Sequence, residues 1–297
     1  MSSLSNCYVP LPHLSSTDPP TLHRNLDSNT PPKDNDKRTP QTLRPIHMTT
    51  HILSQSQGSC LFELGHTKIL VGVIGPRSLP ASTNPSTANV TDGSDGGELQ
   101  CHVQYAPHFG KGTMGSTLPV GRSLVERFRD PISVHPNKEE EQELSQQVTS
   151  ALQASIIKST FPKCVMDVHI RILQADGSLT SSMIIASSLA LCDAGIECYD
   201  LVTACTVAII QSPSTSTPSN PIYHCLVDPT EYEMMQSQGI LTLAMLANAR
   251  NDVTFWDVQG KLPYTILQQE ALELAKYGCH TIHKFMRQCL MASQESS

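Results

Sequence analysis

The sequence predicts an α+β fold with a mixed sheet, helices layered on that sheet, and a single domain. Three observations predict it. Short apolar runs separated by turn residues lie before, between and after two helical segments, one run alternates strictly between inward and outward positions, and an amphipathic helix ends the chain. With 297 residues, 39% of them hydrophobic, the chain can bury one large core.

The first 35 residues show no apolar pattern. They hold prolines among Ser, Thr and Asn, at Pro10, Pro12, Pro19, Pro20, Pro31 and Pro32. Such a stretch cannot bury enough apolar surface to offset the entropy lost on ordering. We therefore predict a disordered tail over residues 1–35 and a folded domain over residues 36–293.

The next segments predict strands. Two apolar runs, 59–64 and 67–74, are separated by Gly65 and His66, which is typical of a β-hairpin. Residues 78–97 are mainly small, polar or turn-forming and predict a surface insertion. A further strand is expected over Leu99–Tyr105.

Two helices and one alternating strand follow. Asn137 is a good N-cap, and Glu139, Glu140 and Glu141 near the first turn complement the helix dipole. Residues 164–172 alternate cleanly, so one side of that strand should be buried. The segment 180–194 is apolar or small on nearly every side, which predicts a helix in the centre of the domain.

The last third predicts four more strands and a long helix. The strands are expected near 201–210, 222–227, 240–247 and 253–258. The helix is amphipathic, with apolar positions at Leu267, Ala271, Leu274, Ile282, Phe285 and Met286.

Composition limits the function classes. The net charge is −7. A protein that attracts nucleic acid through its overall electrostatic field would be basic, so any RNA contact must be confined to a local patch. Charged residues are only 16% of the chain. Either other proteins cover part of the surface, or Ser and Thr solvate it, and composition leaves both open.

The ten cysteines form no CxxC pair and lie mostly in apolar runs, as Cys60, Cys101, Cys192, Cys205 and Cys225 do. Buried free thiols in a reducing compartment explain this better than zinc or disulfides. No apolar run is long enough to span a membrane, and the N-terminus lacks a secretory or transit composition. We therefore expect a soluble intracellular protein with no membrane contact.

Five short motifs, in order, resemble the ribonuclease PH family over about residues 36–290. They are Asp36-Lys37-Arg38, Leu43-Arg44-Pro45, Gly58-Ser59 with Gly65-His66-Thr67-Lys68, Gln174-Ala175-Asp176-Gly177, and Leu191-Cys192-Asp193-Ala194-Gly195. Lys37 departs from the family's usual glycine. Residues 199–202 and 226–231 are similar to one type of ring subunit of the eukaryotic RNA exosome.

The resemblance implies a ribonuclease PH-like fold, also described as ribosomal protein S5 domain 2-like. It implies a place in a six-membered ring of paired ribonuclease PH-like subunits whose pore threads RNA. The expected partners are the other ring subunits, the cap subunits and RNA. The expected locations are the nucleus, the nucleolus and the cytoplasm.

The same resemblance implies lost chemistry. Phosphorolysis joins two anions, so active relatives use arginine, another basic residue and a metal held by two aspartates. In this sequence those positions hold Thr180, Glu140, and Asp228 with Met234. The nearby acids, Glu231 and Glu233, do not match the spacing. We therefore expect no catalytic residue, no metal site and no cofactor.

An active phosphorolytic 3′-to-5′ exoribonuclease is the alternative. The turn Ser178–Ser182, with Ser178, Thr180, Ser181 and Ser182, could bind phosphate through hydroxyls and backbone N–H groups at a helix N-terminus. Simple capping of the buried helix explains the same residues, and we favour it.

A loop at residues 108–135 could contact RNA. It carries Lys111, Arg122, Arg127 and Arg129 against Glu126 and Asp130, in an otherwise acidic protein. Such a loop could bind the phosphate backbone without reading sequence. An ordinary solvated loop fits equally well.

Overall fold

The computed structural model describes residues 41–78, 96–106, 138–211, 223–248, 251–260 and 270–295. In chain order its elements are β1 (Ile46–Thr50), β2 (Gly58–Leu64), β3 (Thr67–Ser78), β4 (Glu98–Tyr105), α2 (Lys138–Gln153), the short 3₁₀ helix η2 (Lys158–Thr160), β5 (Cys164–Gln174), α3 (Leu179–Asp193), β6 (Val202–Gln211), β7 (Tyr223–Val227), α4 (Glu231–Gln236), β8 (Gly239–Leu246), β9 (Asp252–Gly260) and α6 (Leu272–Glu295). The predicted α+β class and mixed sheet are confirmed.

The first sheet has five strands in the order β1-β2-β3-β5-β4. Its predicted hairpin is present, with β2 and β3 paired antiparallel across Gly65 and His66. Strand β4 lies parallel to β5, and α2 lies between them in sequence, as a crossover between parallel strands requires. The sheet is therefore mixed.

The second sheet has four antiparallel strands in the order β7-β6-β8-β9. These are the four strands predicted after the central helix. Their separation into a sheet of their own was not predicted, because the apolar pattern of a strand does not identify its partner. Helix α4, in the turn between β7 and β8, was also not predicted.

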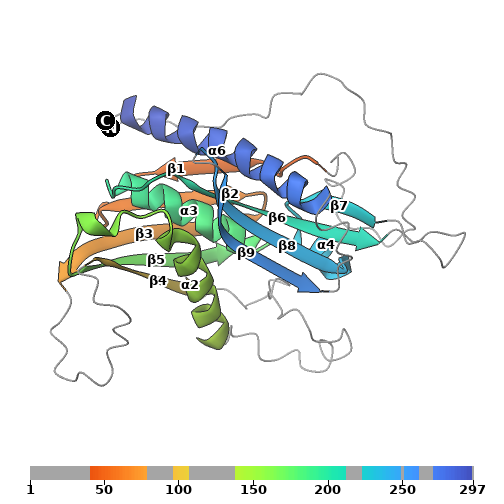
Figure 1. Ribbon diagram of the computed structural model, residues 1–297, viewed down its shortest axis with the longest axis horizontal. Helices are drawn as coiled ribbons and strands as arrows, with labels where there is room; N and C mark the ends of the chain where they lie inside the picture. Colours follow the sequence, from red (N-terminus) through yellow and green to blue (C-terminus); the bar gives the residue numbers. More distant parts are fainter. Residues whose placement is uncertain are drawn as a thin grey trace, which may run out of the picture.

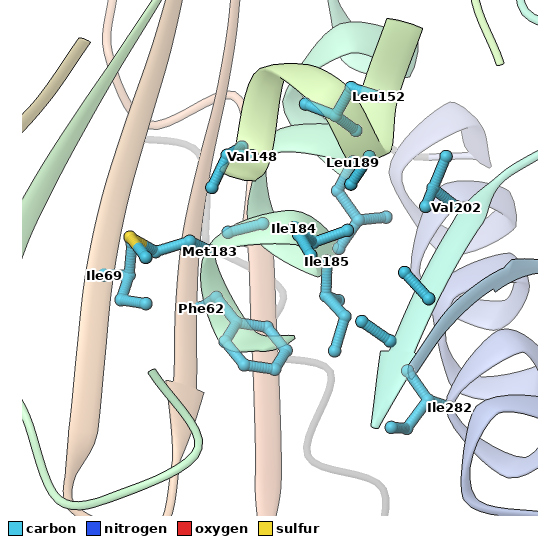
Figure 2. Close-up of a cluster of buried hydrophobic side chains, with 14 of the residues drawn as sticks. Phe62, Ile69, Val148, Leu152, Met183, Ile184, Ile185, Leu189, Val202 and Ile282 are labelled. Carbon is cyan, nitrogen blue, oxygen red and sulfur yellow. The ribbon is translucent and has the colours of Figure 1, made fainter. Parts of the chain in front are cut away.

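Helix α3 packs between the two sheets. Twelve of its fifteen residues are buried, as its nearly uniform apolar composition predicted. Figure 2 shows Met183, Ile184, Ile185 and Leu189 of this helix among Phe62 and Ile69 of the first sheet, Val148 and Leu152 of α2, and Val202 of the second sheet. The core thus joins both sheets into one hydrophobic cluster.

The last helix, α6, crosses the second sheet and reaches β1 (Figure 1). Cys279 of α6 points its thiol at the carbonyls of Thr203 and Leu243, at 3.9 and 3.7 Å. Cys289, farther along, lies 3.6 Å from the carbonyl oxygen of Met48 in β1. The end of the chain therefore covers one of its first strands.

The Leu191–Gly195 motif ties α3 to the start of β2. Asp193 accepts a hydrogen bond from the Ser59 backbone N–H at 2.8 Å and lies 2.8 Å from His51 Nδ1. A Cβ on Gly58 would lie 2.3 Å from the carbonyl oxygen of Ala190, so only glycine allows this approach. The Gly58-Ser59 and Leu191–Gly195 motifs therefore pack the start of β2 against the end of α3.

Several other predictions can be compared with the structure. All nine cysteines in the described part of the chain are free; Cys60, Cys101 and Cys205 are buried, and Cys192 and Cys225 are half-buried. Among the described helices, none is both long and apolar enough to cross a membrane. The predicted tail, Asn137 and Leu267 lie outside the described residues, so the domain limits of 36 and 293 stay predictions.

Candidate functional site

Three turns meet where the two sheets join. One of them contains Asp228, and Thr180 and Met234 lie on the helices that follow two of them. The turns are Leu43–Pro45 before β1, Gln174–Ser178 between β5 and α3, and Asp228–Thr230 between β7 and α4. We call this group the junction cluster. Its contacts show which of its side chains are already bound inside the protein.

Arg44 and Asp228 form a buried ion pair in the junction cluster. Arg44 Nε donates to Asp228 Oδ2 at 2.8 Å, and Nη2 donates to Oδ1 at 2.7 Å. The backbone N–H of Arg44 also donates to Oδ2, at 3.1 Å. The two side chains are 6% and 3% exposed, so both oxygens of this carboxylate are already used inside the protein.

The third nitrogen of Arg44 reaches the turn before α3. Nη1 donates to the carbonyl oxygen of Asp176 and lies 3.4 Å from its Oδ2. Burial lowers the pKa of Arg44, but the hydrogen bond and charge of Asp228, with the charges of Asp176 and Glu233, raise it by more. Arg44 therefore stays positively charged and links the turns. Each nitrogen of its guanidinium is directed at a protein oxygen.

Gly177 lets these turns touch. Its φ is +74°, and a Cβ there would lie 2.3 Å from the carbonyl oxygen of Pro229. Thr67 holds the same turn from β3, because its hydroxyl donates to the Gly177 carbonyl and accepts from the Asp176 N–H, at 3.1 and 3.0 Å. A glycine at this position is thus required by the close packing of the two turns.

The serines at the start of α3 face inward. The hydroxyls of Ser181 and Ser182 donate to the Ser178 carbonyl at 2.9 and 2.8 Å, and that of Ser178 donates to the Pro229 carbonyl at 3.2 Å. All three residues are buried, whereas Thr180 is half-buried. We expected these serines to cap the helix, and this was wrong: Ser178 stands at the N-cap, but its side chain makes no capping hydrogen bond.

Met234 accepts a hydrogen bond instead of holding a metal. Its sulfur lies 3.4 Å from the backbone nitrogen of Ser178, which is an N–H that an anion at this helix end would otherwise use. Met234 lies on α4, whose capping box joins Thr230 and Glu233. Among the described residues, no group of His, Cys, Asp and Glu is arranged to hold a metal ion.

The charge of the junction cluster is unfavourable for phosphate. The charges of Asp228, Asp176 and Glu233 act on Arg44, and the Glu231 backbone N–H lies 3.4 Å from Asp176 Oδ1. The electrostatic field at this junction therefore favours cations and repels an attacking phosphate.

The other predicted positions lie apart from the junction. Glu140 lies in the first turn of α2, where Glu139 and Glu141 accompany it, and Glu141 accepts the Tyr105 N–H at 3.1 Å. The predicted RNA-binding residues Lys111, Arg122, Arg127 and Arg129 lie outside the described residues. They stay predictions.

Sequence reasoning missed the role of Arg44. The sequence contained a signal, because an arginine flanked by Leu43 and Pro45 directly before a strand is poorly placed for solvent. Its partner, 184 residues away, could not be read from spacing. Pairing Arg44 with Asp228 would also have shown that this aspartate is not available to a metal.

Comparison with known proteins gives the same picture of the fold. The RNase PH family, described as "3' exoribonuclease family, domain 1", matches residues 42–197, just over half of the chain. A mouse protein, "Exosome complex component MTR3", is 29% identical over 277 residues, covering 92% of this chain and 90% of that protein. It bears the name, mRNA transport regulator 3, of the ring subunit that residues 199–202 and 226–231 resemble.

Two further relatives agree with it. "Exosome complex component RRP41-like" of Arabidopsis thaliana is 28% identical, covering 86% of this chain and 82% of that protein. The crystal structure of rice Rrp46 superposes with a TM-score of 0.61 at 19% identity, covering 85% of this chain and 97% of that one. At this identity the rice structure supports the fold.

Proposed function

The chain belongs to the RNase PH family of 3′ exoribonuclease domains, and on that premise we propose that it is a non-catalytic structural subunit of the RNA exosome core ring. In this role it assembles the ring and helps guide RNA through the pore, and catalytic partners carry out 3′-to-5′ processing and degradation. The relatives named as exosome components, which match most of the chain, support this assignment.

One observation carries the non-catalytic part of the proposal. Both oxygens of Asp228 accept hydrogen bonds from the buried Arg44, so a hard cation could use this carboxylate only by displacing the arginine. The position where active relatives keep the second aspartate holds Met234, whose sulfur is a poor ligand for Mg²⁺. The hydroxyls of Ser181 and Ser182 donate to the Ser178 carbonyl, so these two groups of the serine-rich turn are not directed at a phosphate.

The proposal includes partners and RNA contacts. Other ring subunits and the cap subunits are the protein partners, and the low share of charged residues agrees with surfaces covered by them. RNA is guided in part by the loop carrying Lys111, Arg122, Arg127 and Arg129. Residence in the nucleus, the nucleolus and the cytoplasm follows from this role.

A phosphorolysis assay tests the non-catalytic role. The purified chain, alone and with a ring neighbour, is incubated with single-stranded RNA and inorganic phosphate, with sulfate replacing phosphate as the control. We expect no phosphate-dependent release of nucleoside diphosphates. Robust release from a preparation free of other nucleases would establish the alternative, an active exoribonuclease using the Ser178–Ser182 turn.

A second measurement tests assembly. Capture of the tagged chain from cells, with identification of the captured proteins, should recover exosome ring and cap subunits. We also expect the isolated chain to be poorly soluble or to dimerise with a paralogue. A stable, monodisperse monomer that captures no exosome subunit would contradict the structural role.

A further inference from the structure

The first sheet has one covered face and one partly open face. Helices α2 and α3 cover the side lined by Val168, Ile170 and Ile172 of β5. Strict alternation along β5 places Asp167, His169 and Arg171 on the other side. Part of that side is covered by the loop before β2: a Cβ on Gly72, which pairs with His169, would lie 3.1 Å from Leu53 Cδ1. His169 and Arg171 themselves are exposed.

A β-bulge brings an arginine to this open face. Ile74 of β3 pairs with Asp167, but Arg77 pairs with Val165, so β3 holds one extra residue between them. As a result Arg77 reaches Asp167 with its Nε, and its Nη2 donates to Oδ1 at 3.1 Å. The arginine side chain is 52% exposed, whereas the aspartate side chain is 8% exposed.

Two stacked histidines lie beside this pair. His102 of β4 and His169 of β5 are partners in the parallel register, and their ring centroids lie 5.1 Å apart with an interplanar angle of 23°. Asp167 Oδ1 lies 3.4 Å from His102 Nε2, so one carboxylate orients both the arginine and the first ring. The His102 side chain is 45% exposed.

Arg171 extends the same face along β5, opposite Gln104. It is exposed, and its charge acts on His169. We call Arg77, His102, His169 and Arg171 the histidine face. Within it, the stacked rings lie between the two arginines. Asp167 holds the Arg77 side chain in place, so this arginine loses little freedom on binding.

We propose that the histidine face binds single-stranded RNA, with Arg77 and Arg171 on phosphates and the imidazole stack under a base. This rests on the proposed function and deepens it, because it assigns the guiding of RNA to a described surface of the sheet. Arginine forks match phosphate oxygens, and base stacking on rings is tolerant of sequence, as a subunit that guides any RNA requires.

RNA fits this surface better than an acidic peptide does. A peptide carboxylate could use the arginines, but it offers no flat surface to the stacked rings, whereas each nucleotide supplies both a phosphate and a base. Burial, followed by the charges of His102, Arg171 and Arg77, lowers the pKa of His169, and Asp167 opposes this. The ring of His169 is therefore mostly neutral near pH 7, and acidification adds positive charge to the face.

Fluorescence anisotropy of a labelled single-stranded oligouridylate with the full chain tests the proposal. The double variant Arg77→Gln/Arg171→Gln should bind about tenfold more weakly than the unchanged chain. The slope of log K against log salt should fall by about 1.4, for two lost phosphate contacts on a single strand. The matched control Lys284→Gln/Arg287→Gln removes two exposed cations from α6 and should change affinity less than about twofold.

A second variant separates stacking from charge. His102→Gln/His169→Gln should weaken binding at neutral pH, because the rings no longer stack on a base. It should also remove the tightening expected as the pH falls below about 6.5 and His169, whose pKa is lowered, takes up a proton. Unfolding curves that coincide with the unchanged chain confirm that both double variants are folded. Equal RNA binding by the arginine variant and the α6 control would overturn the proposal.

An acidic peptide and partner capture complete the experiment. A glutamate oligomer that displaces the RNA at equal concentration of charge would also overturn the proposal, because it would identify a surface for acidic protein. The arginine variant should capture the same exosome subunits from cells as the unchanged chain. If even the unchanged chain captures none, the ring assignment fails, while the RNA measurement still decides the histidine face.

Discussion

The molecule contains two arginine–aspartate forks whose surroundings differ. In the junction cluster, Arg44 and Asp228 are almost fully buried, and every nitrogen of the guanidinium points at a protein oxygen. On the histidine face, Asp167 is buried but half of the Arg77 side chain is exposed. The same pair of groups holds turns together in one place and presents a cation to solvent in the other.

The difference lies in what each arginine can reach. The Arg44 guanidinium contacts Asp228 and Asp176 inside the protein, so its nitrogens are directed at protein oxygens. In the exposed pair, Asp167 is buried in the sheet, and about half of the Arg77 side chain remains in contact with solvent. Burial, more than residue type, decides which pair can bind a ligand.

Breaking the buried fork should have the largest effect. Arg44→Met leaves Asp228 buried without its partner, and we expect the free energy of unfolding to fall by about 3–5 kcal/mol. Urea denaturation with linear extrapolation measures it. Arg44→Lys, which keeps the charge but not the fork, should lose less. A loss below about 1 kcal/mol for Arg44→Met would show that the pair is dispensable.

Changing the aspartate should have a smaller effect. Asp228 has φ of +51°, a conformation that asparagine tolerates, so Asp228→Asn keeps the backbone and one acceptor. We expect a loss of about 1–3 kcal/mol. In a double-mutant cycle, Arg44→Met and Asp228→Asn together should cost less than the sum of the single changes. Simple additivity would mean that the two side chains do not interact.

A buried histidine should make the stability of the folded chain depend on pH. Buried His283 of α6 lies 3.6 Å from Asp200, and burial lowers its pKa, although Asp200 partly opposes this. The unfolded chain therefore takes up a proton near pH 6.5 while the folded chain does not. Stability is fully present above about pH 6.5 and is lost as pH falls toward the lowered folded pKa.

His283→Gln tests this by removing the proton uptake. Urea unfolding across that pH range should show a slope of free energy against pH that is shallower by up to one proton than in the unchanged chain. Identical slopes would assign the acid sensitivity to other groups.

Breaking the exposed fork should have the smallest effect on stability. Arg77→Gln removes a solvent-screened pair, so its urea unfolding curve should coincide with that of the unchanged chain. A clear loss of stability would mean that the open face depends on this pair for its structure. The contrast between the two arginines would then disappear.

Most of the fold could be predicted because its elements depend on local patterns. The alternation over 164–172 and the uniform apolar run over 180–194 each identify one element, and both are present. The division into two sheets could not be predicted in this way. Strand β6 is buried on both sides, so its apolar run does not indicate which strands flank it.

The candidate site was less predictable. The absence of arginine at Thr180 and of aspartate at Met234 could be read directly by resemblance, and this gave the expectation of lost chemistry. Two features could not be read from the sequence because they are tertiary contacts. Arg44 binds the Asp228 carboxylate, and the hydroxyls of Ser181 and Ser182 point into the protein. Arg77 was missed because a single-residue bulge decides which side of the sheet it faces.

The contact between Cys289 and Met48 has a consequence for synthesis of the chain. These residues are 241 positions apart, and α6 forms part of the cover of β1. During translation β1 leaves the ribosome long before α6, which covers it. The apolar side of β1 is therefore exposed until α6 has been synthesised. We therefore expect β1 to be fully covered only after α6 has left the ribosome, and a chain truncated before α6 to depend on chaperones.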